Sequence, residues 1–466
     1  MGESRQIIKT RDDPAPVVLE RDSTVEKMFK LAPEATCSWL KPNKPVGTDT
    51  LRSRIEPWLT ALVQSEHLSL LVGSGLTHAV HWIATEKALP GMGTMSFGIL
   101  DKEIAAEAKR SATLAGRSDG NFEDQIRAAN ELLRGLEILA NSKGKDSKEQ
   151  KQVEALRKGL GSTLSSFAKS IFQGESQLIS APSEKREEAF NYLVSFLMSF
   201  ASRSGTRDRL HLFTTNYDRY IEASADVAGL RLMDRFVGTL APVFRASRLD
   251  VDLHYNPPGI RGEPRYLEGV ARFTKLHGSV DWYDCNGSIR RIGLPFGAAE
   301  ATQSFLKENF DGADPLKLMI YPNAAKDLET AFYPYVELFR DFAAAICRPN
   351  STVICYGYGF GDEHINRVLA DMLTIPSAHL VVIARGDPLD RIMKTYAALG
   401  RHAQFTLLVG DHFGDLRSLV DHYLPKPAID RTTFRMAELL KARWTAGEGR
   451  AEPIVESDAG EGCAAQ

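Results

Sequence analysis

The chain has 466 residues, 43% of them hydrophobic and 25% charged, so it can bury the core of one large domain or of two to three ordinary ones. A formal net charge of −3 gives no overall signal for nucleic-acid binding, and we expect no direct nucleic-acid contact. The five cysteines are scattered without a CxxC pair, which argues against a disulfide framework and a four-cysteine zinc site. Because no apolar run has the length of a signal-peptide core or a membrane span, we expect a cytoplasmic protein without membrane contact.

The first part of the chain combines a polar segment with a strand–turn–helix unit. Residues 1–48 are rich in prolines and charges and predict an N-terminal arm. Residues 67–72 (HLSLLV) predict a buried strand that leads into a GSG turn at 73–75 and then into a helix. This arrangement brings backbone N–H groups and a helix N-terminus up to a phosphate, although such turns also occur as plain tight connections. We assign residues 49–120 to the first part of an α/β core.

The segment 121–205 differs from its surroundings because it contains only helical patterns. Residues 121–140 place their apolar side chains along one helical face, and two more amphipathic stretches follow at about 152–172 and 184–202. Such stripes usually pack in a core and seldom bind ligands. The segment therefore predicts a helical insertion between two parts of the α/β core.

The stretch 210–220 (LHLFTTNYDRY) carries the most informative polar residues. It begins as a short apolar strand and then changes to a polar cluster that includes Asn216 and Asp218. Asn216 offers both a donor and an acceptor, and an ionised Asp218 only accepts. One interpretation is a simple helix N-cap. The other is a ligand site, because ligands of open α/β sheets bind at the carboxyl ends of parallel strands.

The remaining strands are predicted by apolar runs of about six residues. These runs lie at residues 271–276, 316–321, 351–356, 379–384 and 404–409. Continuous apolar runs are typical of parallel strands covered on both faces. Helical stretches separate some of them, so the sum predicts an α/β, doubly wound parallel sheet. Residues 206–425 form the remainder of this core, and residues 426–466 are expected to be a C-terminal helix and a disordered tail.

The turns that follow these strands carry a recognisable set of motifs. GSG at 73–75, TTNYD at 214–218, KLHGS at 275–279 and GYGFGD at 357–362 occur in this order. The ordered set resembles the sirtuin-like (silent-information-regulator-like) NAD-binding proteins, and most closely the bacterial branch found in antiphage defence systems. The resemblance covers about residues 66–420. It implies a Rossmann-like core that binds NAD+ and carries a helical insertion.

The resemblance also implies roles for individual residues. Asn216 and Asp218 would lie beside the nicotinamide ribose and the nicotinamide, and His277 would be the catalytic histidine, although a lone histidine is more often structural. The residues expected to bind the rest of NAD+ are Gly73, Ser74 and Gly75 at the pyrophosphate, Thr215 and Tyr217 beside Asn216, Gly357, Tyr358, Gly359 and Phe360 at the adenosine half, and Arg385, Asp411 and His412 at the adenine-side strand ends.

Two departures from the sirtuin pattern limit what the resemblance implies. Sirtuin deacylases carry a zinc module with paired cysteines, and this chain has no such pairs. After the first Gly-rich turn the family has a G-I-P-D-F-R type stretch, where this chain has LTHAVHWIATEKALPG. We therefore expect no bound metal, and only the NAD-cleaving half of the sirtuin chemistry is retained.

The function that follows is NAD+ glycohydrolase activity, which converts NAD+ to ADP-ribose and nicotinamide. By the resemblance, the protein would deplete NAD+ in abortive infection and would act as a homo-oligomer with a HerA-type hexameric ATPase. One alternative is an NAD-dependent protein deacylase or ADP-ribosyltransferase, which would release nicotinamide only with an acceptor. A second is a non-catalytic subunit that binds NAD or ADP-ribose and regulates another protein.

Overall fold

The structure is a computed structural model in which twelve stretches of the chain are described. They are residues 5–10, 12–22, 28–41, 44–89, 95–114, 120–143, 147–203, 207–247, 252–255, 265–285, 287–298 and 333–426. The chain divides into two units, Met1–Pro425 and Lys426–Gln466. The predicted strand at 316–321 and the predicted C-terminal helix and tail beyond residue 426 lie outside the described residues.

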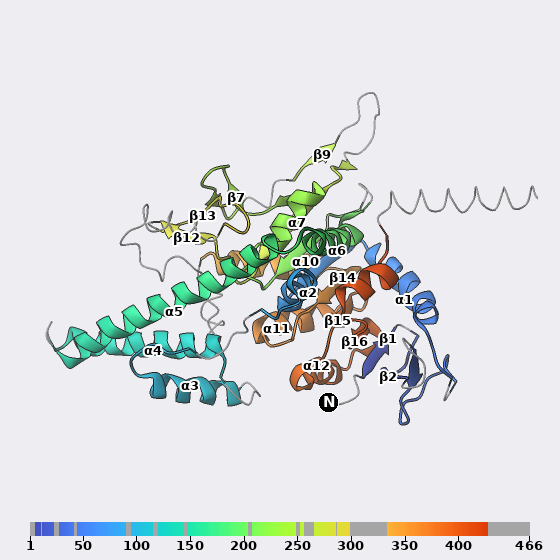
Figure 1. Ribbon diagram of the computed structural model, residues 1–466, viewed down its shortest axis with the longest axis horizontal. Coiled ribbons are helices and arrows are strands. Elements are labelled where there is room, and N and C mark those ends of the chain that lie inside the picture. The colour runs from blue at the N-terminus through green and yellow to red at the C-terminus, as the bar shows by residue number, and fades with distance from the viewer. Residues whose placement is uncertain are drawn as a thin grey trace, which may run out of the picture. The chain divides into compact units, whose positions relative to one another are not determined.

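The core of the first unit is a ten-stranded sheet with the strand order β3-β2-β1-β16-β15-β14-β4-β5-β11-β6. Figure 1 shows β14, β15, β16 and β1 as neighbours in this sheet. From β16 to β6 every neighbouring pair is parallel. All residues of β5, β14, β15 and β16 are buried, which explains why these strands are continuous apolar runs in the sequence. The parallel strands are β4 (His67–Val72), β5 (His211–Thr214), β6 (Arg231–Met233), β11 (Val270–Lys275), β14 (Ser351–Tyr356), β15 (His379–Ala384) and β16 (Phe405–Val409).

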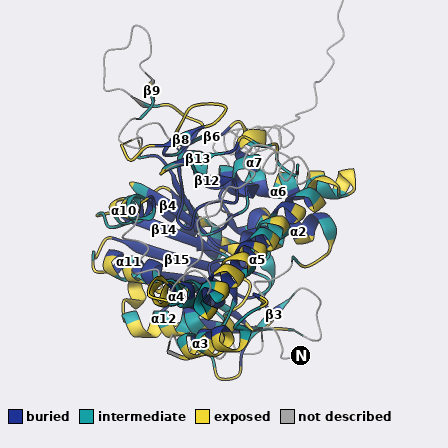
Figure 2. Ribbon diagram, turned by 90° about the vertical axis from the view of Figure 1, so that its left-hand side faces the viewer, coloured by how far each residue is buried: buried dark blue, intermediate teal, exposed yellow. Residues whose placement is uncertain are grey.

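Helices cover both faces of this sheet, so the predicted doubly wound α/β fold is confirmed. Figure 2 shows β4, β14 and β15 between α10 and α11 on one side and α2 and α6 on the other. One apolar core contains α1 (Thr48–Val63), α2 (Ser74–Thr85), α6 (Ser183–Ala201), α7 (Tyr220–Ala228), α13 (Leu416–Ser418) and η5 (Leu419–Tyr423). The other contains α10 (Tyr335–Ile346), α11 (Glu363–Leu373) and α12 (Arg391–Leu399), with the short turns η3 (Pro388–Asp390) and η4 (His402–Gln404) beside α12.

The strand order reverses at β4, which places a ligand crevice there. After β4 the chain continues to β5 and β11 on one side and later returns to β14 on the other side. Helices that follow strands on opposite sides of such a switch point diverge, and their N-termini leave a crevice at the carboxyl ends of the strands.

Three helices form a separate packed group with its own apolar core. They are α3 (Asp101–Leu114), α4 (Phe122–Asn141) and α5 (Lys148–Ile179), and they lie side by side in Figure 1. Asn121 begins α4 with a capping box, in which its side chain and that of Asp124 each accept from the other's backbone N–H. The group differs from the predicted insertion at 121–205, because α3 precedes residue 121 and α6 packs in the sheet core.

The predicted N-terminal arm is wrong for its described part, which extends the sheet. β1 (Gln6–Lys9) pairs antiparallel with β16, and β2 (Val17–Arg21) and β3 (Phe29–Leu31) follow. The polar composition was misleading because polar side chains are buried here with partners. Lys9 is 1% exposed, and its Nζ donates to the carbonyl of Phe405 at 3.2 Å. Asp13 is also buried and accepts from Arg54 at 2.7 Å.

Short strands outside the main sheet were also not predicted. A four-stranded sheet has the order β12-β13-β8-β7, and β9 pairs with β10. These strands are β7 (Phe236–Val237), β8 (Val243–Phe244), β9 (His254–Tyr255), β10 (Arg265–Tyr266), β12 (Trp282–Cys285) and β13 (Ser288–Arg291). Strands of two to four residues are too short to give a periodic signal. No helix in the described stretches combines the length and the apolar character needed to span a membrane.

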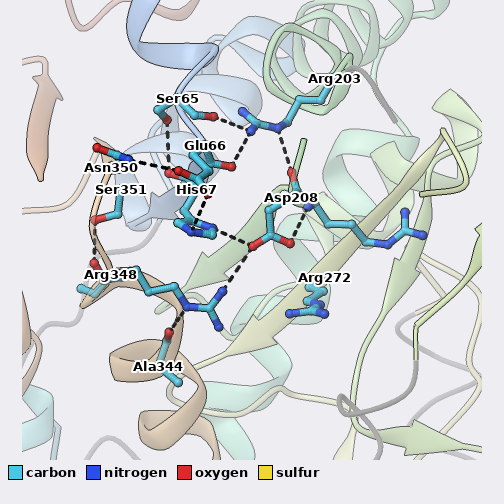
Figure 3. A network of polar contacts seen from close by, with 12 residues as sticks. Ser65, Glu66, His67, Arg203, Asp208, Arg272, Ala344, Arg348, Asn350 and Ser351 are labelled. Atoms are coloured by element: carbon cyan, nitrogen blue, oxygen red, sulfur yellow. Dashed lines mark hydrogen bonds and ion pairs between the residues drawn. The ribbon is translucent and has the colours of Figure 1, made fainter. Parts of the chain in front are cut away.

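The amino ends of the central strands are joined by a polar network (Figure 3). The Asp208 carboxylate accepts from His67 Nδ1 at 2.9 Å and from Arg348 Nη1 at 3.3 Å. The Arg203 guanidinium donates to three carbonyls at or just after the end of α1, among them that of Ser65 at 2.6 Å. Burial lowers the pKa of Arg203 to about 10. The network holds the starts of β4, β5 and β14 together, at the end of the sheet opposite the crevice.

At the crevice, the two Gly-rich turns touch each other through their backbones. Gly75 N–H donates to the carbonyl of Gly357 at 3.1 Å. A Cβ on Gly75 would lie 2.6 Å from the Gly357 Cα, and a Cβ on Gly357 would lie 2.6 Å from the Gly75 Cα. Gly357 also has a φ of +62°, which favours glycine. The glycines therefore permit the close approach of two turns that follow β4 and β14.

We expect Gly75→Ala to lower the free energy of unfolding by about 1–3 kcal/mol, because the added methyl group must displace the backbone of the second turn. Urea unfolding at neutral pH measures the difference. Gly359→Ala is the matched control, since a Cβ at Gly359 has no described atom within 4 Å. Equal unfolding midpoints for the two variants would contradict the packing role of Gly75.

Candidate active site

A cavity of about 660 Å³ lies at the carboxyl ends of the central strands. Its size falls within the usual range of ligand pockets, about 300–1,000 Å³. The turns after β4, β5, β11 and β14 form one part of its wall, and residues of α3, α4 and α5 form another. The cavity therefore occupies the switch point of the sheet, between the core and the three-helix group.

Most of the predicted site residues line this cavity, including the three predicted catalytic residues. The lining includes Gly73, Ser74, Thr215, Asn216, Tyr217, Asp218, His277, Gly357, Tyr358 and Gly359. These residues come from four strand ends that are far apart in the sequence. They meet because β11, β5, β4 and β14 are consecutive neighbours in the sheet.

Five predicted NAD-binding residues are not in this lining. Gly75 is occupied in the contact with Gly357. Phe360 is buried with its ring centroid 4.9 Å from that of Tyr358, and Arg385 is exposed. Asp411 and His412 follow β16, which is separated from β4 by β15 and β14. Asp411 and His412 do follow the carboxyl end of a strand, as predicted, but this strand is not next to the switch point at β4.

Asp411 and His412 instead connect the end of β16 to its surroundings. The Asp411 carboxylate accepts from Arg21 Nη2 at 2.8 Å. The two ring nitrogens of His412 lie 2.7 Å from the Tyr423 hydroxyl and 3.2 Å from that of Ser418. Both residues therefore contribute contacts that hold the N-terminal strands and η5 against the sheet.

A hydrogen-bonded relay fixes the orientation of Asn216 in the cavity. Its Nδ2 donates to the carbonyl of Gly73 at 3.0 Å and to the Thr77 hydroxyl at 2.9 Å. The Thr77 hydroxyl in turn donates to Asp218 Oδ2 at 2.6 Å. Because a carbonyl oxygen only accepts, the amide nitrogen must be the atom that faces Gly73. Asn216 therefore keeps its Oδ1 as an acceptor for a ligand.

His277 lies against a second histidine that the sequence did not indicate. The Nε2 atoms of His277 and His364 are 3.3 Å apart, and both side chains are buried. Asp362 completes a group of three whose ligand-type atoms all lie within 4.8 Å of one another. His364 and Asp362 sit at the N-terminus of α11, directly after the second Gly-rich turn. Their position between a predicted strand and a predicted helix could have indicated both residues as site candidates.

The three-helix group contributes a cation that was also missed. Arg127 of α4 lines the cavity and has a side chain 12% exposed. It donates to Ser111 and to Glu131, but its buried Nε has no partner among the described atoms. Arg391, at the start of α12, is a second cation in the wall. Both arginines provide positive charge for an anionic ligand.

A buried ion pair fastens α5 to the turn that carries Asn216 and Asp218. The Glu175 carboxylate accepts from Arg219 Nη2 at 2.6 Å and from the Arg219 backbone N–H at 3.0 Å. Burial raises the pKa of Glu175, while the hydrogen bonds from Arg219 favour the charged carboxylate. Removing one partner of such a pair leaves an uncompensated buried charge. The pair therefore fixes the three-helix wall relative to the polar turn after β5.

The structural role of His412 predicts an effect of pH on stability. Burial, together with the charges of His422 and Arg21, lowers the pKa of His412 to about 4. Between pH 6.5 and 4 the unfolded chain binds a proton at this histidine that the folded chain does not bind, so the free energy of unfolding falls as the pH falls. We expect His412→Gln to lose less stability than the wild type between pH 7 and pH 5.

Urea unfolding at the two pH values measures this loss. His402→Gln is the matched control, because it removes an exposed histidine. The same loss of stability in wild type and in His412→Gln would contradict the assignment.

The geometry agrees with a comparison against known families. Residues 210–402, from the residue before β5 to the first residue of η4, match the family described as SIR2-like domain. No curated protein matches the chain. SIR2-like domains are often NAD-utilising enzymes, and the mostly parallel, Rossmann-like sheet is consistent with their fold. Residues 210–402 are therefore similar to SIR2-like domains, and this similarity indicates an NAD-related activity.

Proposed function

We propose that the chain is an NAD+ glycohydrolase that converts NAD+ and water to ADP-ribose and nicotinamide. The observation that supports this most is the convergence of Asn216, Asp218 and His277 in one cavity with both Gly-rich turns. Cleavage of the glycosidic bond needs an oriented water molecule, a proton acceptor and a site for the departing base. The cavity supplies a candidate residue for each of these roles.

The proposed reaction assigns one step to each of the three residues. Nicotinamide leaves with the electron pair of the C1′–N bond, and the positive charge that develops on the ribose is stabilised by nearby acceptors. Asn216 Oδ1 orients the water that attacks C1′, and His277 accepts a proton from that water. The Asp218 carboxylate accepts from the carboxamide N–H of nicotinamide and so directs the leaving group away from the ribose.

The diphosphate of NAD+ is proposed to bind between the first Gly-rich turn and the three-helix wall. The N-terminus of α2 begins at Ser74, which lines the cavity, and helix N-termini favour anions. Arg127 and Arg391 add positive charge to the same wall. Because the Arg127 side chain lines the cavity, its guanidinium is a candidate donor to a phosphate oxygen.

The biological role is proposed from the resemblance of the motifs. It is depletion of NAD+ as an effector of bacterial antiphage defence, in the cytoplasm, by a homo-oligomer that assembles with a HerA-type hexameric ATPase. A partner is a reasonable requirement for such an activity, because an uncontrolled NAD+ glycohydrolase would harm its own cell.

The test is nicotinamide release from NAD+ by the purified chain, alone and with a co-purified HerA-type ATPase. We expect Asn216→Ala and His277→Ala each to lower the rate by about 100-fold or more, as for removal of groups that position water or accept protons. His402→Ala changes an exposed histidine that does not line the cavity, and it should retain the wild-type rate. Full activity in both site variants would overturn the assigned roles.

The same assay separates the proposal from its alternatives. Nicotinamide release that occurs only when an acyl-lysine peptide or an acceptor protein is added would indicate a deacylase or an ADP-ribosyltransferase. Saturable NAD+ binding without release under any of these conditions would indicate a regulatory subunit.

The relay to Asn216 predicts a separate effect for Thr77. We expect Thr77→Val to lower kcat by about tenfold, with a smaller change in KM, because the substitution removes the hydrogen bonds of the hydroxyl with Asn216 and with Asp218, each of roughly 0.5–1.5 kcal/mol. Thr77→Ser should restore most of the activity because it restores the hydroxyl. Steady-state kinetics with NAD+ measures both parameters.

Thr85→Val is the matched control for this effect, because the Thr85 hydroxyl donates to the carbonyl of His81 on the same helix, α2. Equal kcat values in Thr77→Val and Thr85→Val would show that the relay has no role in turnover.

A further inference from the structure

The group formed by His277, Asp362 and His364 has the chemistry of a metal site. Each residue offers one ligand atom, and these atoms lie within 4.8 Å of one another. The two histidines are 6% and 8% exposed, and all three residues line the cavity. The absence of paired cysteines led to the expectation of no metal. That reasoning could not detect a group whose histidines are 87 positions apart in the chain.

The distance between the histidines matches that of two ligands on one metal ion. Zinc binds imidazole nitrogen at 2.0–2.1 Å in tetrahedral geometry, so two such nitrogens on one ion lie about 3.3–3.4 Å apart. The Nε2 atoms of His277 and His364 are separated by 3.3 Å. The same separation also allows an N–H···N hydrogen bond between the two rings, which a bound ion would replace. The two rings are therefore already placed as a chelating pair.

Asp362 supplies the third ligand from a position where a different contact is usual. It is the N-cap residue of α11, and an aspartate there normally accepts from a backbone N–H of the first turn. In this helix the Asp362 side chain makes no such capping bond. Its carboxylate lies instead beside the two imidazoles. Two imidazoles and one carboxylate would leave one position of a four-coordinate ion for another ligand.

We propose that His277, Asp362 and His364 together bind one divalent cation of the zinc class, and that this cation inhibits the enzyme. Imidazole-rich donor sets favour Zn2+ and its late first-row neighbours, whereas Mg2+ and Ca2+ prefer oxygen ligands. Inhibition rests on the proposed function. A cation on His277 Nε2 occupies the lone pair that would accept the proton, so metal binding and NAD+ cleavage exclude each other.

Binding is tested without reference to activity, with Co2+ as a spectroscopic probe and Zn2+ as its competitor. The full-length chain is first treated with a chelator and then titrated with Co2+. We expect one Co2+ per chain, with the intense visible bands of a four-coordinate ion, and displacement of these bands by Zn2+. Asp362→Asn and His364→Ala should each weaken Co2+ binding at least tenfold, whereas His402→Ala should bind as wild type.

Asp362→Asn preserves the size of the side chain, and circular dichroism establishes that each variant is folded. No visible bands in the wild type, or equal binding in wild type and both site variants, would overturn the metal site.

The activity measurement separates the metal site from the proposed function. We expect Zn2+ to reduce nicotinamide release by the wild type, and the Zn2+ concentration for half-inhibition to rise at least tenfold in Asp362→Asn, relative to that variant's own metal-free rate. Metal binding with continued NAD+ cleavage would overturn the inhibitory role alone. Metal binding by a chain that releases no nicotinamide under any condition would overturn the proposed function and leave the metal site standing.

Discussion

The contact between the two Gly-rich turns is the constraint on which the cavity depends. Gly75 and Gly357 approach until neither position has space for a Cβ. This contact brings the turn after β4 against the turn after β14, at the point where the strand order reverses. Helix α2 therefore begins at the base of the crevice, and α11 begins close to His277. A larger residue in either turn would separate the groups that the sheet brings together.

The polar side chains of the cavity are held by one another as well as by the sheet. In one chain of hydrogen bonds, the Asn216 amide donates to the Thr77 hydroxyl, and this hydroxyl donates to the Asp218 carboxylate. His277 and His364 are buried within contact distance. A water-filled site with freely rotating groups would have to order them for each ligand, whereas these groups are ordered before a ligand arrives. This arrangement suits both a hydrolytic reaction and a bound cation.

The sequence was sufficient for the central strands and for the polar strand ends that line the cavity, for a physical reason. Parallel strands buried on both faces are continuous apolar runs, and their carboxyl ends carry the polar turns. The N-terminal strands were missed because Gln6 and Lys9 are buried polar residues, which composition alone assigns to solvent. Arg127 was missed because it belongs to an amphipathic helix, and His364 because its partner lies in a distant segment. The order of the strands in the sheet places His412 away from the cavity, and this order cannot be read from short sequence patterns.

The ion pair between Glu175 and Arg219 connects the long helix α5 mechanically to the turn after β5. Glu175 lies near the C-terminal end of this 32-residue helix, and Lys148 at the other end is about 40 Å away at a rise of 1.5 Å per residue. The point of attachment is Arg219, one position after Asp218. A small rotation of the helix about this point produces a large displacement at the far end. Conversely, a partner that binds near Lys148 and tilts α5 would, through the Glu175–Arg219 ion pair, shift the turn that carries Asn216 and Asp218.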